Sequence, residues 1–138
     1  MTELLLGQLI SFAGNPFTQG VEAARHTTHG GVVIDAGRIV ATGDGDALRK
    51  AHPGARITDY GQDLISAGFI DAHVHFPQTA IIASWGKRLI DWLNTYTFPE
   101  EMRFADAGYA AEIAARYLDL TLANGTTSIC TYATIHPQ

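Results

Sequence analysis

Two histidines spaced one residue apart are the side chains of this sequence whose type and spacing best suit chemistry. They lie in the stretch GFIDAHVHFPQ, which runs from Gly68 to Gln78. In a β-strand, side chains alternate between two faces, so His73 and His75 share one face with their Cβ atoms about 6.6 Å apart. Imidazoles at this spacing can lean together onto one metal ion, at about 2.0–2.1 Å per Zn–N bond. The spacing alone fits either a metal-binding pair or two histidines that lie at the surface or are satisfied within a core.

The rest of this stretch fits a strand that ends at an active site. Its other face carries three apolar side chains that helices could cover, those of Ile70, Ala72 and Val74. Pro77 has no N–H for a sheet, so the strand should stop just after His75. That position is the C-terminal end of the strand, where α/β barrels place their chemistry. Asp71 shares the histidine face, and we predict that it either orients a ligand histidine, as carboxylates near metal ligands commonly do, or has a structural role.

The composition limits the classes of protein to which the chain can belong. It has 138 residues, 46% of them hydrophobic and 17% charged, and a net charge of −5. These values fit a soluble globular domain or part of a larger one, and the acidic balance argues against a nucleic acid partner. The only cysteine, Cys130, excludes an intrachain disulfide and is predicted to be a small buried residue. The apolar run at residues 4–10 is too short for a signal peptide or a membrane span, so we predict a cytoplasmic protein.

The first half of the chain has the pattern of short antiparallel strands and turns. Strands are predicted at residues 4–12, 31–34, 38–42, 57–60 and 64–65, and residues 17–30, with His26 and His29, are predicted to be loop. Asp35-Ala36-Gly37 supplies a hairpin turn, and Asp46 is predicted to cap a short helix over 47–52. Because a core needs two layers, we expect residues 1–66 to be part of a small β-sandwich that needs further strands.

The second half has the pattern of a strand, a helical connection and a second strand. Apolar spacing predicts a broken helix over residues 79–92, and residues 94–101 are predicted to be loop. Asp106 is a plausible N-cap for a helix that ends at Asn124-Gly125. The β-branched run at 126–133 is the next strand. This order predicts a parallel α/β unit with a right-handed crossover.

Three segments together give the chain a family resemblance. They are HVHFPQ at 73–78, LIDWLNTYTFPE at 89–100, and the segment from Asn124 to His136 that begins NGTT and ends YATIH. Together they resemble the guanine deaminase family of the amidohydrolase superfamily, and the second segment is the most specific of the three. The resemblance implies an α/β fold, the N-terminal part of a TIM-like (β/α)8 barrel preceded by part of a small β-sandwich. Residues 67–138 would be the start of that barrel, with its first two strands and connecting helices.

The resemblance also implies a reaction and a set of site residues. The reaction is hydrolytic deamination of guanine to xanthine and ammonia by a zinc-activated water, whose pKa the metal lowers toward about 7. His73 and His75 would bind the zinc, and Gln78 would contact the guanine edge. Trp92 would either wall the base pocket or pack in the core. His136 is either a residue at the mouth of the site or a structural loop histidine. The implied partner is a small-molecule purine, and the complete protein is expected to be a homodimer.

Several alternatives stay open at this point. The sequence accounts for two of the eight strands of a barrel, and for two of the usual three protein ligands of a catalytic zinc. No catalytic acid or base is identifiable, so we expect an N-terminal portion that is inactive alone. Iron or another divalent metal could replace zinc. The parent protein could be another amidohydrolase that acts on a different purine, pyrimidine or triazine ring. The chain could also be a non-catalytic fragment that works as a metal-binding or interaction module.

Overall fold

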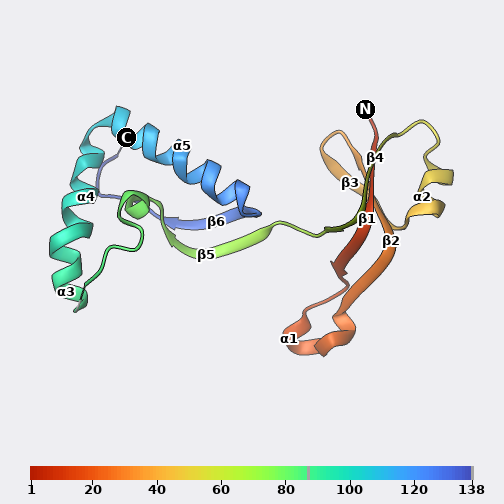
Figure 1. The fold of residues 1–138 in the computed structure, drawn as a ribbon, viewed down its shortest axis with the longest axis horizontal. Helices are drawn as coiled ribbons and strands as arrows, with labels where there is room; N and C mark the ends of the chain where they lie inside the picture. The colour runs from red at the N-terminus through yellow and green to blue at the C-terminus, as the bar shows by residue number, and fades with distance from the viewer. Residues whose placement is uncertain (87, 138) are drawn as a thin grey trace. The chain divides into compact units, whose positions relative to one another are not determined.

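The computed structural model describes residues 1–86 and 88–137. The chain forms two compact units, Met1–Ala67 and Gly68–Gln138, whose elements are labelled in Figure 1. Each unit has a sheet of its own, with four strands in the first and two in the second. None of the described helices is long and apolar enough to cross a membrane.

The first unit is built on a mixed sheet with the strand order β3-β2-β1-β4. Its strands are β1 (Glu3–Phe12), β2 (Ala24–Asp35), β3 (Arg38–Asp44) and β4 (Arg56–Ile65). β1 pairs antiparallel with β2, and β2 with β3, but β4 runs parallel to β1. The prediction of antiparallel strands throughout is therefore wrong for β4. A parallel neighbour needs a long crossover, and here the β2–β3 hairpin and the helix α2 (Gly45–Ala51) provide it.

The connections of this unit correct two further predictions. A short helix α1 (Pro16–Gln19) and a 3₁₀ turn (Gly20–Ala23) follow β1, and β2 then begins at Ala24, so His26 and His29 lie in a strand and not in a loop. The sequence hid this part of β2 because most of its side chains are polar and exposed. Asp44, and not Asp46, caps α2, because its Oδ1 accepts a 2.9 Å hydrogen bond from the Ala47 amide.

A small aliphatic core holds the first unit together. Leu4 and Val33 are fully buried and Leu6 nearly so, and Leu48 of α2 packs against them. The hairpin between β2 and β3 turns at Ala36 and Gly37, which have φ values of 48° and 75°. Two positive φ values in succession are the mark of a type I′ turn, and the predicted hairpin is confirmed.

The second unit contains the predicted strand–helix–strand arrangement. β5 (Phe69–His75) and β6 (Thr126–Tyr132) pair in parallel, and α5 (Ala107–Ala123) connects them and runs along the pair in Figure 1. Asp106 caps α5 as predicted, since its Oδ1 accepts a 2.8 Å hydrogen bond from the Tyr109 amide. Gly125, with a φ of 81°, follows the helix in the left-handed region, as Asn-Gly predicts.

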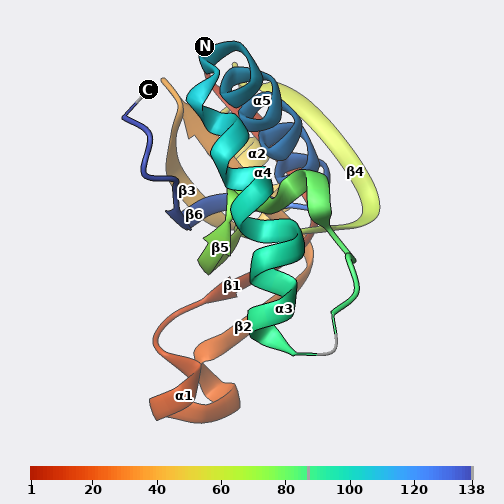
Figure 2. The same cartoon turned by 90° about the vertical axis from the view of Figure 1, so that its left-hand side faces the viewer.

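The connection between β5 and α5 differs most from the prediction. Among the described residues of this range, a 3₁₀ helix at Phe76–Ile81 and a short α3 (Leu89–Trp92) replace the single helix predicted over 79–92. Residues 94–101 are helical and not loop, because α3 passes through a π turn (Leu93–Thr97) into α4 (Phe98–Met102), as Figure 2 shows. Pro99 is the second residue of α4 and comes shortly after the π turn. A 3₁₀ turn at Arg103–Ala105 leads on to α5.

Candidate functional site

The two predicted ligand histidines lie side by side on β5. Their ring centroids are 5.5 Å apart and their planes are tilted by 43°. The strand is not regular here, because Asp71 pairs with Ile129 and Val74 with Thr131, which leaves an extra residue on the β5 side. Such bulges re-aim side chains and are frequent next to active sites.

A third ring, which the sequence analysis did not identify, lies against both histidines. The Tyr132 ring stacks on His75 with a centroid distance of 4.7 Å and an angle of 13°, and lies 5.0 Å from His73. Tyr132 is the residue of β6 that pairs with His75. The signal that points to it is the parallel pairing itself, since the last residues of neighbouring parallel strands meet at one edge.

The histidine pair suits a metal ion but supplies only part of a coordination sphere. Two imidazoles bound to one tetrahedral zinc at about 2.0–2.1 Å per bond have their ring centres roughly 5 Å apart, which is close to the observed 5.5 Å. Both side chains are exposed and thus accessible to an ion. Within residues 1–86 and 88–137, no group of three or more His, Cys, Asp or Glu side chains is placed to hold a metal.

Asp71 supports the strand that carries the histidines. Its Oδ1 accepts a 3.1 Å hydrogen bond from the backbone N–H of His73, so its contact is with the backbone of this histidine and not with the ring. Burial raises the pKa of the Tyr117 hydroxyl, and the negative charge of Asp71 raises this pKa further.

One cavity brings several of the predicted site residues together. It has a volume of about 340 Å³, and His73, His75, Gln78 and Trp92 all line it. Its apolar lining includes Val74, Ile82 and Leu120. We call this cavity the histidine pocket. A concave, largely apolar site with a few convergent polar groups is the usual form of a small-molecule site.

The polar tips of Gln78 and Trp92 are held by other parts of the second unit. Gln78 Nε2 donates a 3.1 Å hydrogen bond to Glu101 Oε1. Trp92 Nε1 donates a 3.0 Å hydrogen bond to the carbonyl oxygen of Ser84. Both bonds are partly buried, so the two side chains have fixed orientations at the wall of the histidine pocket.

A buried carboxylate anchors α4 beside this wall. Glu100 is only 6% exposed; it accepts a 2.9 Å hydrogen bond from Arg103 Nη1 and a short one from the Tyr109 hydroxyl. The Arg103 guanidinium also lies 3.9 Å from the centre of the Tyr109 ring. Burial, with the bond to Glu100, raises the pKa of Tyr109 to about 12, and the bond to Glu100 raises the pKa of Arg103. Glu100 and Glu101 were not predicted as site residues, and the signal for them is their place directly after Pro99.

His136 and Cys130 lie outside the lining of the histidine pocket. His136 follows β6, its backbone N–H donates to Thr134 Oγ1 at 3.2 Å, and its Nε2 is buried without a hydrogen-bond partner among the described residues. It does not line the histidine pocket. Cys130 is exposed, so the prediction of a buried thiol is wrong. The reason is that nearly all of β6, and not only one face, is exposed.

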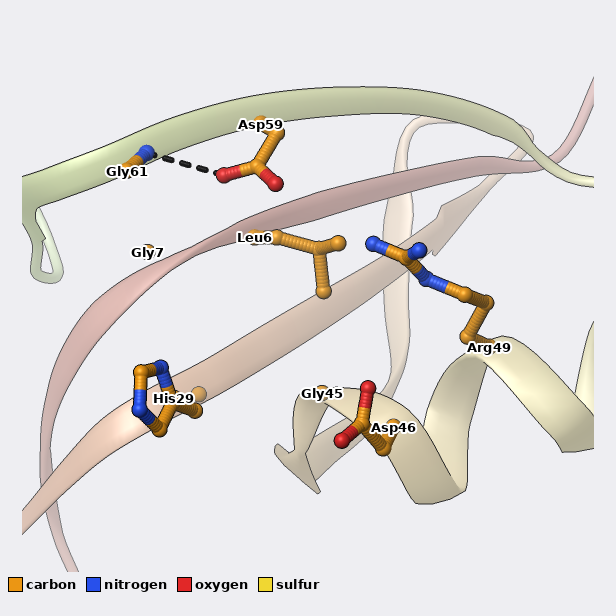
Figure 3. A pocket seen from close by; sticks show the side chains of 9 residues that line it. Leu6, Gly7, His29, Gly45, Asp46, Arg49, Asp59 and Gly61 are labelled. Carbon is orange, nitrogen blue, oxygen red and sulfur yellow. Dashed lines mark hydrogen bonds between the residues drawn. The ribbon is translucent and has the colours of Figure 1, made fainter.

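A second cavity, of about 260 Å³, lies in the first unit (Figure 3) and is lined by the charged side chains of Asp46, Arg49 and Asp59 together with His29. Asp59 Oδ1 accepts a 2.8 Å hydrogen bond from the amide of Gly61, within its own turn. Among the described residues, no hydrogen bond or ion pair joins these four side chains to one another. The histidine pocket is therefore the better candidate site.

Comparison with known proteins identifies the family. A model of the amidohydrolase family matches residues 64–138, more than half of the chain. The chain belongs to the amidohydrolase family. Residues 30–55 of this amidohydrolase also match a model described as an imidazolonepropionase-like composite domain of bacteria.

Individual relatives of this amidohydrolase are guanine deaminases. It is 37% identical over 117 residues to the guanine deaminase of Escherichia coli, which covers 84% of this chain and 27% of that protein. It is 47% identical over 75 residues to the rat enzyme, covering 54% of this chain and 16% of that protein. The resemblance predicted from the sequence is confirmed.

Solved structures agree with this assignment. The guanine deaminase of Bradyrhizobium japonicum superposes with a TM-score of 0.93 at 35% identity, over 99% of this chain and 30% of that one. A guanine deaminase from C. acetobutylicum, solved with guanine in its active site, gives 0.82 at 28% identity, over 99% and 31%. The predicted α/β fold class is confirmed. The chain spans less than a third of the length of the relatives it matches.

Proposed function

We propose that the protein carrying this chain hydrolyses guanine to xanthine and ammonia, and that the histidine pocket is part of its active site. The observation that carries the proposal is the convergence of the adjacent His73 and His75 rings with Gln78 in one cavity. The guanine deaminase relatives support the choice of substrate. Residues 1–86 and 88–137 hold no group of three or more metal-ligating side chains, so we propose that this chain is inactive in isolation.

We propose zinc as the metal, held by His73 and His75 with ligands from outside the described residues. Once bound, the ion would supply a water of lowered pKa, about 7, as the nucleophile. Neutral imidazole suits zinc but also iron and other divalent metals, so metal analysis belongs in the test. The bond from the His73 amide to Asp71 steadies the strand on which both ligands stand.

Two side chains of the pocket are proposed to bind the purine. The amide of Gln78 offers both a donor and an acceptor, which suits the edge of a base that carries both kinds of group. The Trp92 ring, fixed by its bond to Ser84, is proposed as a wall for the flat ring system. For His136 we propose a place near the mouth of the site, because it follows the C-terminal end of β6, where barrels place their active-site residues.

The proposed setting of this site follows the relatives. We propose that residues 1–66 are part of a small β-sandwich, and that residues 67–138 begin a (β/α)8 barrel. The partner would be a small-molecule purine and not nucleic acid or a membrane, and the complete protein would be a homodimer. A single, exposed thiol fits a reducing compartment such as the cytoplasm.

The test uses the full-length product of the gene that encodes these residues. Guanine, adenine, cytosine and a chlorinated triazine are compared as substrates by ammonia release, and the metal content is measured by elemental analysis. Guanine should be converted to xanthine, with zinc bound. Ammonia release from one of the other rings, with none from guanine, would replace this proposal by another amidohydrolase activity.

Two variants and a control test the metal ligands. His73→Ala and His75→Ala should each lower zinc content and reduce guanine turnover by at least about 100-fold, because even the outer partners of metal ligands are worth 10–100-fold. His26→Ala is the matched control, since His26 lies on β2 and contacts Gln8, and it should leave both quantities unchanged. Full zinc content in both ligand variants would show that the pair does not hold the metal.

A further inference from the structure

The contact between Glu101 and Gln78 determines how the histidine pocket presents its amide. Gln78 lies in the 3₁₀ helix after β5 and Glu101 in α4, 23 residues later, and Gln78 Nε2 donates to Glu101 Oε1 at 3.1 Å in a partly buried setting. An ionised carboxylate can only accept hydrogen bonds. The amide of Gln78 must therefore turn its nitrogen toward Glu101, which leaves its oxygen and one N–H for a ligand.

The position of Glu101 is itself fixed by its neighbour in the chain. Glu100 is buried and is bonded to Arg103 and Tyr109, which ties α4 to the start of α5. The Tyr109 ring in turn packs edge-on against Phe104, at a centroid distance of 5.4 Å. A group that orients a binding residue must be supported in this way, since a loose contact would not select one orientation.

We propose that Glu101 is a positioning residue that fixes the orientation of the Gln78 amide, so that the pocket presents an oxygen acceptor to its ligand. A pocket with a fixed acceptor selects ring compounds that carry an N–H donor at the facing edge, because a ligand without one leaves the oxygen unpaired. This inference rests on the proposed function for the identity of the ligand, a purine with N–H donors. It goes beyond that function because it assigns the selection of ligands with an N–H donor to Glu101, a residue that does not line the histidine pocket.

The variant that tests the orientation is Glu101→Gln, in the full-length protein. Glutamine has the same size but offers both a donor and an acceptor, so the Gln78 amide can pair with it in either orientation. The KM for guanine should rise on the order of 10-fold, the scale on which one lost hydrogen bond acts, and kcat should change by less than about threefold. Glu112→Gln is the matched control, since Glu112 is exposed and pairs with Arg116, and it should change neither. An unchanged KM in Glu101→Gln would overturn the proposal.

A measurement without substrate separates this inference from the proposed function. The Gln78 side-chain amide protons are followed by NMR and assigned by their loss in Gln78→Ala. One of them should exchange slowly in the unmodified protein. It should exchange about 10-fold faster in Glu101→Gln, because the Gln78 amide can then pair with residue 101 in either orientation. Equal exchange in the two proteins overturns the positioning role even if guanine is deaminated. Slow exchange that Glu101→Gln abolishes supports the positioning role even in a protein that does not act on guanine.

Discussion

In residues 1–67 the most deeply buried side chains are aliphatic and lie between a sheet and a helix, as with Leu4 and Val33, which have no exposed surface. In residues 68–137 the buried set includes a carboxylate, Glu100 at 6% exposure, and the aromatic rings of Phe104 and Tyr117, at 2% and 7%. The first unit is organised by strand pairing and apolar burial. The second relies on specific hydrogen bonds and ring contacts among its helices.

The difference explains where the candidate site lies. In the second unit the strands are mostly exposed, including His73 and His75, because the packing takes place around α4 and α5. The helices hold Gln78 and Trp92 by directed polar bonds, which fix an orientation as apolar packing alone does not. The candidate site therefore lies in the unit whose packing includes directed hydrogen bonds.

The largest expected effect comes from the aliphatic core of the first unit. Leu4→Ala should lower the free energy of unfolding of this unit by about 2–5 kcal/mol, because it leaves a cavity in a fully buried place. The control is Leu64→Ala, at a residue 56% exposed, which should change stability by less than about 0.5 kcal/mol. Amide hydrogen exchange resolved by residue measures both. Equal loss of protection in residues 68–137 would contradict the division into two units.

The next effect concerns the buried carboxylate of the second unit. Glu100→Ala removes the acceptor of Arg103 and Tyr109 and should cost about 1.5–3 kcal/mol, the value of hydrogen bonds to a charged group. The control is Glu112→Ala, which breaks an exposed ion pair with Arg116 worth about 0.3–0.5 kcal/mol. Denaturant unfolding compares the two variants. If both variants lower the free energy of unfolding by the same amount, the buried hydrogen bonds of Glu100 do not stabilise this unit more than an exposed ion pair does.

A smaller effect is expected at the start of α5. Asp106→Ala removes the cap on the Tyr109 amide and should cost about 0.5–2 kcal/mol. Asp119→Ala, on the exposed surface of the same helix, is the control and should stay within about 0.5 kcal/mol. The exchange rate of the Tyr109 amide gives a direct measurement, and an unchanged rate in Asp106→Ala would show that the cap is not needed.

The last effect appears only at alkaline pH, as a dependence of stability on pH. The pKa of Tyr109 is raised from about 10 to about 12 in the folded chain. A raised pKa means that the stabilisation is complete below pH 10 and is lost as the pH rises from about 10 to about 12. Tyr109→Phe should remove this part of the pH dependence, whereas Tyr60→Phe, at an exposed residue, should not. Tyrosinate absorbance and unfolding measured over this pH range test it.

The features predicted correctly from the sequence are those that depend on neighbouring residues. The cap at Asp106, the hairpin at Ala36-Gly37 and the glycine after α5 each follow from a few residues and their backbone preferences. The adjacency of His73 and His75 follows from the two-residue repeat of a strand, and the ring distance of 5.5 Å agrees with it although the strand is bulged.

The features that were missed depend on residues far apart in the chain. The parallel pairing of β4 with β1 joins segments more than 50 residues apart, and Tyr132 reaches the histidines only through the pairing of β5 with β6. The helix through residues 93–102 contains Thr97 and Pro99, which disfavour a helix locally, and it forms because tertiary contacts bury Thr97 and Glu100. Propensity is a weak guide where such contacts override it.

The π turn at Leu93–Thr97 sets the angular phase of everything that follows it in the helix. A π turn holds one residue more than an α turn, so the residues after it are rotated by about 100° about the helix axis relative to an uninterrupted α-helix of the same sequence. An α turn in its place, with the sequence unchanged, would swing Glu100 out of its buried place and carry Glu101 away from Gln78, whereas deleting one residue from the turn would leave both side chains where they are. The choice between a π turn and an α turn at this place thus decides which side chains the helix directs toward the pocket.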